Sequence, residues 1–263
     1  MKKIFLPMCS LLFLVLLMTA CSADEKAELE DIYQQTLTAS EELENFEMEA
    51  EVNQQVEGGE VEIPPISTTI NAEIQLKPLA FHQTMDMMGQ TVEMYYTEEG
   101  MFFKDPQQGQ WMKGPKELAD QLNMAAVQQQ QNPTDQLKQL EDYAEDFSIE
   151  ETDNRYILSL SASGEGFDQL LEEQLNSLPE GEITAEVLDT LKINKLDYTI
   201  TVSKDTYYLE TMTVDMDLDI EENGTTTNLS QKMESTYRNF NELDTIEIPE
   251  EVTDTAIEME NPM

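Results

Sequence analysis

Residues 211–220 have the sequence TMTVDMDLDI, which alternates strictly between two kinds of side chain. The apolar set is Met212, Val214, Met216, Leu218 and Ile220, and threonine or aspartate stands at each position between them. Successive side chains of a β-strand point to opposite faces of the sheet. The alternation therefore predicts a strand with one buried face and one hydrated face.

The same two-residue period recurs along the chain. It predicts strands over residues 46–52, 70–76, 81–88, 91–97 and 101–106, a hairpin over 146–163 with Asp153-Asn154 at its tip, and strands over 193–203, 206–220 and 225–240. Gly89-Gln90 and Asn223-Gly224 supply turns of the kind that join antiparallel neighbours. Most of the sheet is therefore expected to be antiparallel.

Helical periodicity interrupts these strands. Apolar residues recur every three or four positions over residues 27–43, and similar spacing predicts helices over 115–131, 134–143, 167–177 and 184–192. This order of helices and strands is typical of an α+β fold, in which helices cover one face of a large antiparallel sheet.

The first 26 residues resemble the start of an exported bacterial lipoprotein. Lys2 and Lys3 precede an apolar stretch at residues 4–20, which predicts a signal peptide over residues 1–20 that is cleaved. The stretch MTAC at residues 18–21 resembles a lipobox, except that Met18 stands where leucine is commonest. The resemblance implies that Cys21 is lipidated and begins the mature chain, followed by a lipidated tether over residues 21–26. A secreted or membrane-inserted chain is the alternative, although the apolar stretch is short for a spanning helix.

A lipid on Cys21 would hold the protein on the outer face of the bacterial cell membrane without a spanning helix. The second cysteine, Cys9, lies within the predicted signal peptide. No disulfide is therefore expected in the mature chain, and the core alone must hold the fold together.

Acidic residues dominate the charge of the chain. There are 55 Asp and Glu against 14 Lys and Arg, and the net charge is −41. Nucleic acid is excluded as a partner because phosphate binding requires clustered Lys and Arg. The same charge repels anionic lipid headgroups, so the domain is expected to stand off the membrane surface. Solubility in a salty exterior is favoured over a specific acidic site as the reason for this composition.

The sequence MYYTEEGMFFKDPQQGQWMK at residues 94–113 resembles a hairpin of the LolA/LolB and LppX/LprG-like superfamily of lipoproteins and lipid carriers. It is also similar to a hairpin in an uncharacterised family of Gram-positive lipoproteins. The resemblance implies a single domain over residues 27–250, built as a half-barrel of curved antiparallel sheet whose concave face is covered by helices. Residues 251–263 would then form an acidic C-terminal tail. Members of the superfamily hold acyl chains or other apolar groups between the sheet and its helices.

Methionine and aromatic residues are the candidates for lining such a ligand pocket. The candidate residues are Met94, Tyr96, Phe102, Trp111, Met212 and Met216. Methionine adapts its shape and recurs at surfaces that accept varied apolar partners. Core filling is the alternative, both for the methionines and for the aromatic residues around Trp111.

Patterns for catalysis and metal binding are not found in the sequence. His82 is the one histidine, and no Gly-rich phosphate loop or nucleophile motif is present. Asp215, Asp217 and Asp219 resemble half of a calcium loop, but Ile220 stands where that loop requires glycine. No enzymatic activity, catalytic residue, metal or cofactor is therefore predicted.

Two functions remain open from the sequence. The first is a lipid-anchored extracytoplasmic protein that binds a lipid-like or apolar ligand between sheet and helices. The second is a structural or regulatory envelope lipoprotein that docks a protein partner and has no ligand cavity. A continuous cavity lined by methionine and aromatic side chains would favour the first.

Overall fold

The computed structural model describes residues 21–58, 63–115, 132–162, 191–222 and 224–259. The predicted signal peptide lies outside these residues. The helix predicted over 167–177 also lies outside them. So does nearly all of each of the helices predicted over 115–131 and 184–192, although residue 115 is described without helical structure and residues 191–192 belong to a strand.

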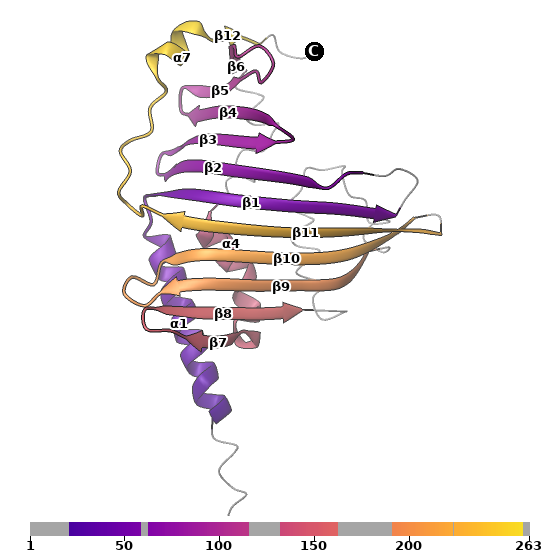
Figure 1. The fold of residues 1–263 in the computed structure, drawn as a ribbon. Helices are drawn as coiled ribbons and strands as arrows, with labels where there is room; N and C mark the ends of the chain where they lie inside the picture. The colour runs from indigo at the N-terminus through magenta and orange to yellow at the C-terminus, as the bar shows by residue number, and fades with distance from the viewer. Residues whose placement is uncertain (1–20, 59–62, 116–131, 163–190, 223, 260–263) are drawn as a thin grey trace, which may run out of the picture.

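Twelve strands form one sheet in the order β12-β6-β5-β4-β3-β2-β1-β11-β10-β9-β8-β7 (Figure 1). Their bounds are β1 Asn45–Gly58, β2 Ile66–Leu76, β3 Leu79–Met87, β4 Gln90–Thr97, β5 Gly100–Lys104, β6 Trp111–Gly114, β7 Ser148–Glu151, β8 Arg155–Ala162, β9 Leu191–Ser203, β10 Leu209–Glu222, β11 Thr225–Arg238 and β12 Ile257–Glu258. Neighbours in this described sheet run antiparallel except β12 and β6. The predicted α+β class with a large curved antiparallel sheet is confirmed.

Helices cover one face of the sheet. The helices α1 (Cys21–Glu41) and α4 (Pro133–Leu140) lie behind the strands in Figure 1, and the 3₁₀ helix η1 (Glu141–Asp146) follows α4. We call the concave face that they cover the inner face and the opposite one the outer face. Buried residues of α1 and α4 join those of the strands in one hydrophobic core on the inner face.

The strand register places the alternating apolar residues of neighbouring strands side by side. Ala50, Ser235, Met212 and Ile200 form one row across β1, β11, β10 and β9, and each is at most 3% exposed. Because paired residues of neighbouring strands share a face, this row defines the inner face on all four strands. The alternation that predicted a half-buried strand over residues 211–220 is thus confirmed.

Tyr33 and Leu137, both fully buried, join α1 to α4. The Tyr33 hydroxyl donates a hydrogen bond to the carbonyl oxygen of Leu137. The Thr134 hydroxyl donates to the carbonyl oxygen of Ser40 at 2.8 Å, and the Asn132 side chain caps α4 by accepting from the Thr134 amide at 3.0 Å. Burial, followed by the charge of nearby Glu141, raises the pKa of Tyr33 far above its ordinary value.

The segment predicted as a tether is helical in the structure, because α1 begins at Cys21. Residues 21–41 contain no glycine or proline that would interrupt a helix. Among the described residues, no helix is both long and apolar enough to cross a membrane.

The segment predicted as an acidic tail is also ordered where the structure describes it. Residues 251–259 of that predicted tail form the end of a longer segment, residues 239–259, which we call the C-terminal strap; it passes the ends of the strands from β11 to β6 and contains α7 (Glu250–Thr255) and β12 (Figure 1). The Leu243 amide donates to Asn45 Oδ1 at 3.0 Å and the Ile246 amide donates to Gln75 Oε1 at 3.3 Å. Val252 is 1% exposed. Hydrogen bonds to distant residues therefore hold a segment whose own composition is mostly polar.

Candidate functional site

Charge is divided between the two faces of the sheet. The register assigns to the inner face the even-numbered residues 46–56 of β1. It also assigns to this face the residues paired with them, strand by strand, through β2 to β6 on one side and through β11, β10 (as far as Ile220), β9 and β8 on the other. Within these described strands the inner-facing set contains no Asp, Glu, Lys, Arg or His. The charged residues of the same strands face outward, in a chain that has 55 acidic residues.

The inner face changes from fully buried to half-buried along the strands. Next to the buried row that contains Met212, the residues Val52, Met233 and Val214 form a row that is only partly buried. We call the partly buried apolar residues that continue the core on this face the apolar strip; they include Ile70, Met94, Tyr96, Phe103, Val214 and Met216. An uncharged apolar surface with residual solvent exposure can accept a further apolar group.

Four of the six predicted lining residues share the inner face. Met94 and Tyr96 lie there on β4 and Met216 on β10, all three half-buried, while Met212 is 2% exposed and belongs to the core. The register pairs Met94 with Phe103 and Gln83, which shows that these positions continue one face across β3, β4 and β5.

Phe102 and Trp111 face the opposite way. Phe102 pairs with Tyr95 and Lys113, and Trp111 pairs with Lys104, all on the outer face. The six residues therefore cannot line a single pocket on the inner face. The sequence did contain the signal for this division, because a turn at Glu98-Glu99 sets Thr97 opposite Gly100. Tyr95 and Phe102 then share one face of the hairpin, and Tyr96 and Phe103 share the other.

The outer-face aromatic residues form a small cluster of their own. The rings of His82 and Tyr95 stack at 4.2 Å, Tyr95 and Trp111 are 5.7 Å apart, and Lys104 Nζ lies 5.4 Å from the Trp111 ring centre. His82 also lies between Glu73 and Glu93, at 3.5 and 3.2 Å. Burial is the largest cause that raises the pKa of Tyr95, followed by the charge of Glu93. Because these side chains contact one another, the cluster stabilises the part of the outer face that β3 to β6 form.

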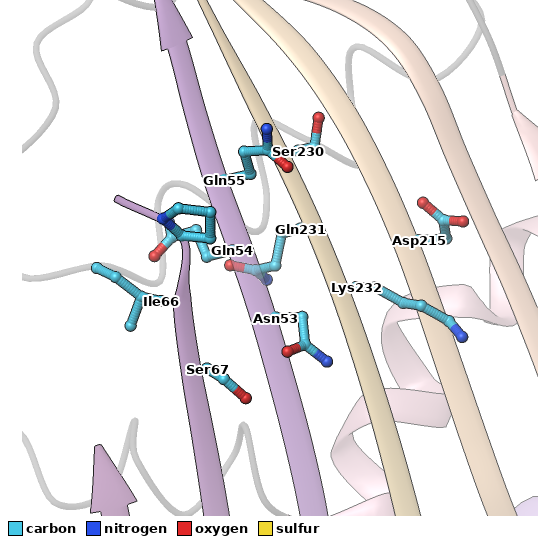
Figure 2. A pocket seen from close by; sticks show the side chains of 10 residues that line it. Asn53, Gln54, Gln55, Ile66, Ser67, Asp215, Ser230, Gln231 and Lys232 are labelled. Carbon is cyan, nitrogen blue, oxygen red and sulfur yellow. The ribbon is translucent and has the colours of Figure 1, made fainter. Parts of the chain in front are cut away.

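A shallow polar hollow of about 240 Å³ lies where β2, β1, β11 and β10 meet (Figure 2). Its lining includes the outer-facing Asn53, Ser67, Asp215 and Lys232, and also Gln54 and Gln231, which the register assigns to the inner face. A second hollow of about 470 Å³ lies beside Val56 and Pro64, and a third of about 330 Å³ lies between α1 and residues 206–207. None of these three hollows contains Met94, Tyr96, Met212 or Met216.

Asp217 and Asp219 on the outer face of β10, which we call the acidic ladder, accept hydrogen bonds from side-chain amides. Asp217 accepts hydrogen bonds from Asn194 at 2.9 Å, Asn228 at 3.0 Å and Ser230 at 3.1 Å. The bonds from Asn194 and Asn228 lower the pKa of Asp217, and the same two amides lower the pKa of Asp219. Within the part of the chain that the structure describes, no group of three or more His, Cys, Asp or Glu side chains is placed to hold a metal ion.

Solved structures with similar folds include bacterial lipoproteins. Mycobacterium tuberculosis lipoprotein LppX has a TM-score of 0.42 and 14% identity, over 84% of this chain and 99% of LppX. LprF from Mycobacterium bovis has a TM-score of 0.44 and 12% identity, over 85% of this chain and 97% of LprF. A LolA superfamily protein from Nitrosomonas europaea has a TM-score of 0.23 and 7% identity, over 85% of this chain and 96% of that protein.

No curated protein matches the chain. A family model described as "Family of unknown function (DUF6612)" matches residues 28–257, which is most of the chain. The protein therefore belongs to the DUF6612 family.

Proposed function

We propose that this protein is a lipid-anchored extracytoplasmic binding protein whose inner sheet face holds a lipid-like or apolar ligand. The observation that carries the proposal is that, in a strongly acidic chain, the inner-facing residues of the described strands include no charged side chain. Each CH₂ group that leaves water for such a surface contributes about 0.8 kcal/mol, so an acyl chain can bind firmly without polar contacts along its length. The half-buried Met94, Tyr96, Val214 and Met216 of the apolar strip are the proposed contacts.

The anchor is proposed from the sequence and from where α1 begins. A diacylglyceryl group on Cys21 would tie the N-terminus of α1 to the outer face of the cell membrane, while the acidic outer face of the sheet stays in solvent. Metabolic labelling with a fatty-acid probe tests this proposal. The wild-type chain should carry the label and the Cys21→Ala variant should not; an unlabelled wild-type chain would remove the anchor from the proposal.

A protein-docking lipoprotein with a filled interior is the second candidate. It is favoured by the full burial of Met212 and by the position of the three hollows away from the apolar strip. In that case the half-buried strip would be core, and no lipid would accompany the protein.

Native mass spectrometry of the full chain, transferred from membranes into amphipathic polymer, distinguishes the two functions. The wild type should carry a non-covalent acyl ligand in addition to any covalent anchor. A Met216→Lys change places a charge on the apolar strip and should remove the ligand. The matched control is Thr213→Lys, on the outer face of the same strand beside Glu234, which should leave the ligand in place.

A bare wild-type chain would favour the docking function. Loss of the ligand from both variants alike would show that its site is not on the inner face. Circular dichroism melting of each variant separates loss of the ligand from loss of the fold.

A further inference from the structure

We infer that Gln54 and Gln231 form a polar binding site on the inner face. The two side-chain amides bind an uncharged ester or hydroxyl group of the ligand. The inference rests on the proposed function and names the class of ligand, which is a neutral acyl ester of the diacylglycerol type.

Gln54 and Gln231 lie directly opposite each other on β1 and β11. Their row continues to Ile66 on β2 and to Met216 on β10. In Figure 2 the Gln231 side chain extends from β11 toward β1. The pair thus adjoins Met216, one of the residues proposed to contact the ligand.

Apolar rows lie on both sides of this pair. On one side are Val52, Met233 and Val214, and on the other are Val56, Leu229 and Leu218. A ligand chain that follows the strands across these rows must pass over the two amides. On β1, β11 and β10 the two amides therefore lie between two apolar rows.

The two amides are half-buried, and neither has a hydrogen-bond partner among the described residues. Their outer-face neighbours differ in this respect. Asn53 donates to Glu51 at 2.8 Å and Gln55 donates to Glu57 at 2.7 Å. As far as the described residues are concerned, Gln54 and Gln231 therefore keep their donors and acceptors for water or for a ligand.

A plain hydrocarbon laid over the pair would remove its water and return no hydrogen bond, which is costly for a polar group. An ester carbonyl can accept from the amide N–H groups, and a hydroxyl can also donate to the amide oxygens. The inner-facing set of the described strands contains no Lys, Arg or His that could neutralise a phosphate or carboxylate. Lys232, which lines the same hollow as Gln54 and Gln231, lies on the outer face and is paired with Glu234 at 3.0 Å. The chemistry of this row thus selects an uncharged polar group on an acyl lipid.

Photo-crosslinking of the full chain in membrane-derived polymer discs tests the inference. The probe is dioleoylglycerol with a diazirine in one chain, and crosslinked residues are located by peptide mass spectrometry. Unlabelled dioleoylglycerol should compete at least tenfold better than squalane, a plain hydrocarbon, or dioleoyl phosphatidic acid, which has the same chains and a charged headgroup.

The double variant Gln54→Leu with Gln231→Leu keeps the size of the side chains and removes the amides. It should weaken competition by dioleoylglycerol at least tenfold and strengthen competition by squalane. Gln55→Leu on the outer face is the matched control and should change neither value. The single variant Gln231→Met introduces the same residue as Met216, its neighbour in the row, and is a milder change in case the double variant does not fold. It should show a smaller loss of competition by dioleoylglycerol.

The possible failures are distinguishable. Unchanged lipid preference in the double variant, with crosslinks still on the inner face, would overturn the role of the amides and leave the proposed function intact. Equal competition by phosphatidic acid would overturn the uncharged class of ligand. Absence of inner-face crosslinks in the wild type would overturn the proposed function itself.

Discussion

The two faces of the sheet differ in the charge of their side chains: the inner face of the described strands is uncharged, and the outer face carries the charged residues. Along β10, the inner-facing Met212, Val214 and Met216 are apolar, while the outer-facing Asp215 and Asp217 accept hydrogen bonds from polar side chains of β9. Because neighbouring residues of one strand carry the two kinds of chemistry, composition alone says little about where the charge lies. Within the paired strands that the structure describes, as far as Ile220 on β10, the acidic side chains belong to the outer face and the inner face is uncharged.

A charge placed on the buried row should have the largest effect on this division. Met212→Asp would bury a carboxylate at a position that is 2% exposed and has no cation among the inner-facing residues of the described strands. We expect a loss of more than about 4 kcal/mol in the free energy of unfolding, enough to prevent folding. Thr211→Asp on the outer face of the same strand should cost less than about 1 kcal/mol. Urea unfolding followed by circular dichroism measures both, and equal losses would contradict the two-face description.

Truncation of the helix layer should have the next largest effect. Leu137→Ala on α4 removes a fully buried side chain from the core, and we expect a loss of about 2–5 kcal/mol in the free energy of unfolding. Met216→Ala on the half-buried strip should cost clearly less, because its side chain is already partly in contact with solvent. The same urea titration compares the two variants. A larger loss at Met216 would show that the strip is tightly packed core and would weaken the case for a ligand surface.

The sequence was sufficient for features that depend on local periodicity. The alternation over residues 211–220 correctly identified which residues face the core, and the turn at Asp153-Asn154 correctly joined β7 and β8. The separation of Phe102 and Trp111 from Met94 and Tyr96 was missed, because a list of aromatic residues ignores the face on which each lies. Here the hairpin register, and not residue type, decides the surface to which a side chain belongs.

Features that depend on pairing between distant segments could not be predicted in this way. Gln54 and Gln231 meet only because β1 pairs with β11, and nothing near either residue indicates that pairing. The end of the C-terminal strap, residues 251–259, was predicted as part of a tail. Its position depends on hydrogen bonds from Gln110 to the Thr255 carbonyl oxygen at 2.6 Å and from the Met259 amide to the Lys113 carbonyl oxygen at 2.9 Å, and these partners lie far away in the chain. Long-range hydrogen bonds of this kind leave no periodic signal in the sequence.

The strap should loosen when its link to β1 is removed. Asn45 accepts from the Leu243 amide and donates to the Leu243 carbonyl oxygen at 3.4 Å, so Asn45→Ala breaks a reciprocal pair. We expect a loss of about 1–2 kcal/mol in the free energy of unfolding. Hydrogen exchange should accelerate in residues 241–258 and remain slow in β9 and β10. Unchanged exchange in the strap would show that Val252 and β12 hold it without Asn45.

Alkaline pH should destabilise the inner side of the molecule through Tyr237. Burial is the largest cause that raises the pKa of this tyrosine, to about 12 from an ordinary value of 10.0, and its hydroxyl donates to Gln136 Oε1 at 3.0 Å. Below pH 10 the hydroxyl is protonated in both the folded and the unfolded chain. Between pH 10 and about 12 it ionises only in the unfolded chain, so the free energy of unfolding falls by about 1.4 kcal/mol per pH unit. Tyr237→Phe should reduce this slope in urea titrations at pH 9 to 11, and an identical slope would show that Tyr237 does not contribute.

Acid should have a smaller effect, and it should act on the outer face. The hydrogen bonds from Asn194 and Asn228 lower the pKa of Asp217 in the folded chain below its ordinary value of 3.8. The stability that they contribute is complete above that value and is lost as the pH falls through the lower folded-state pKa. Because Asp217 is largely solvated, the effect should be modest and should weaken further in high salt. Asp217→Asn removes the titrating group, so its urea midpoint should fall less than that of the wild type between pH 5 and pH 2. Parallel curves for the two proteins would mean that the acidic ladder of the outer face contributes no acid sensitivity, and that acid acts on this chain through its overall charge alone.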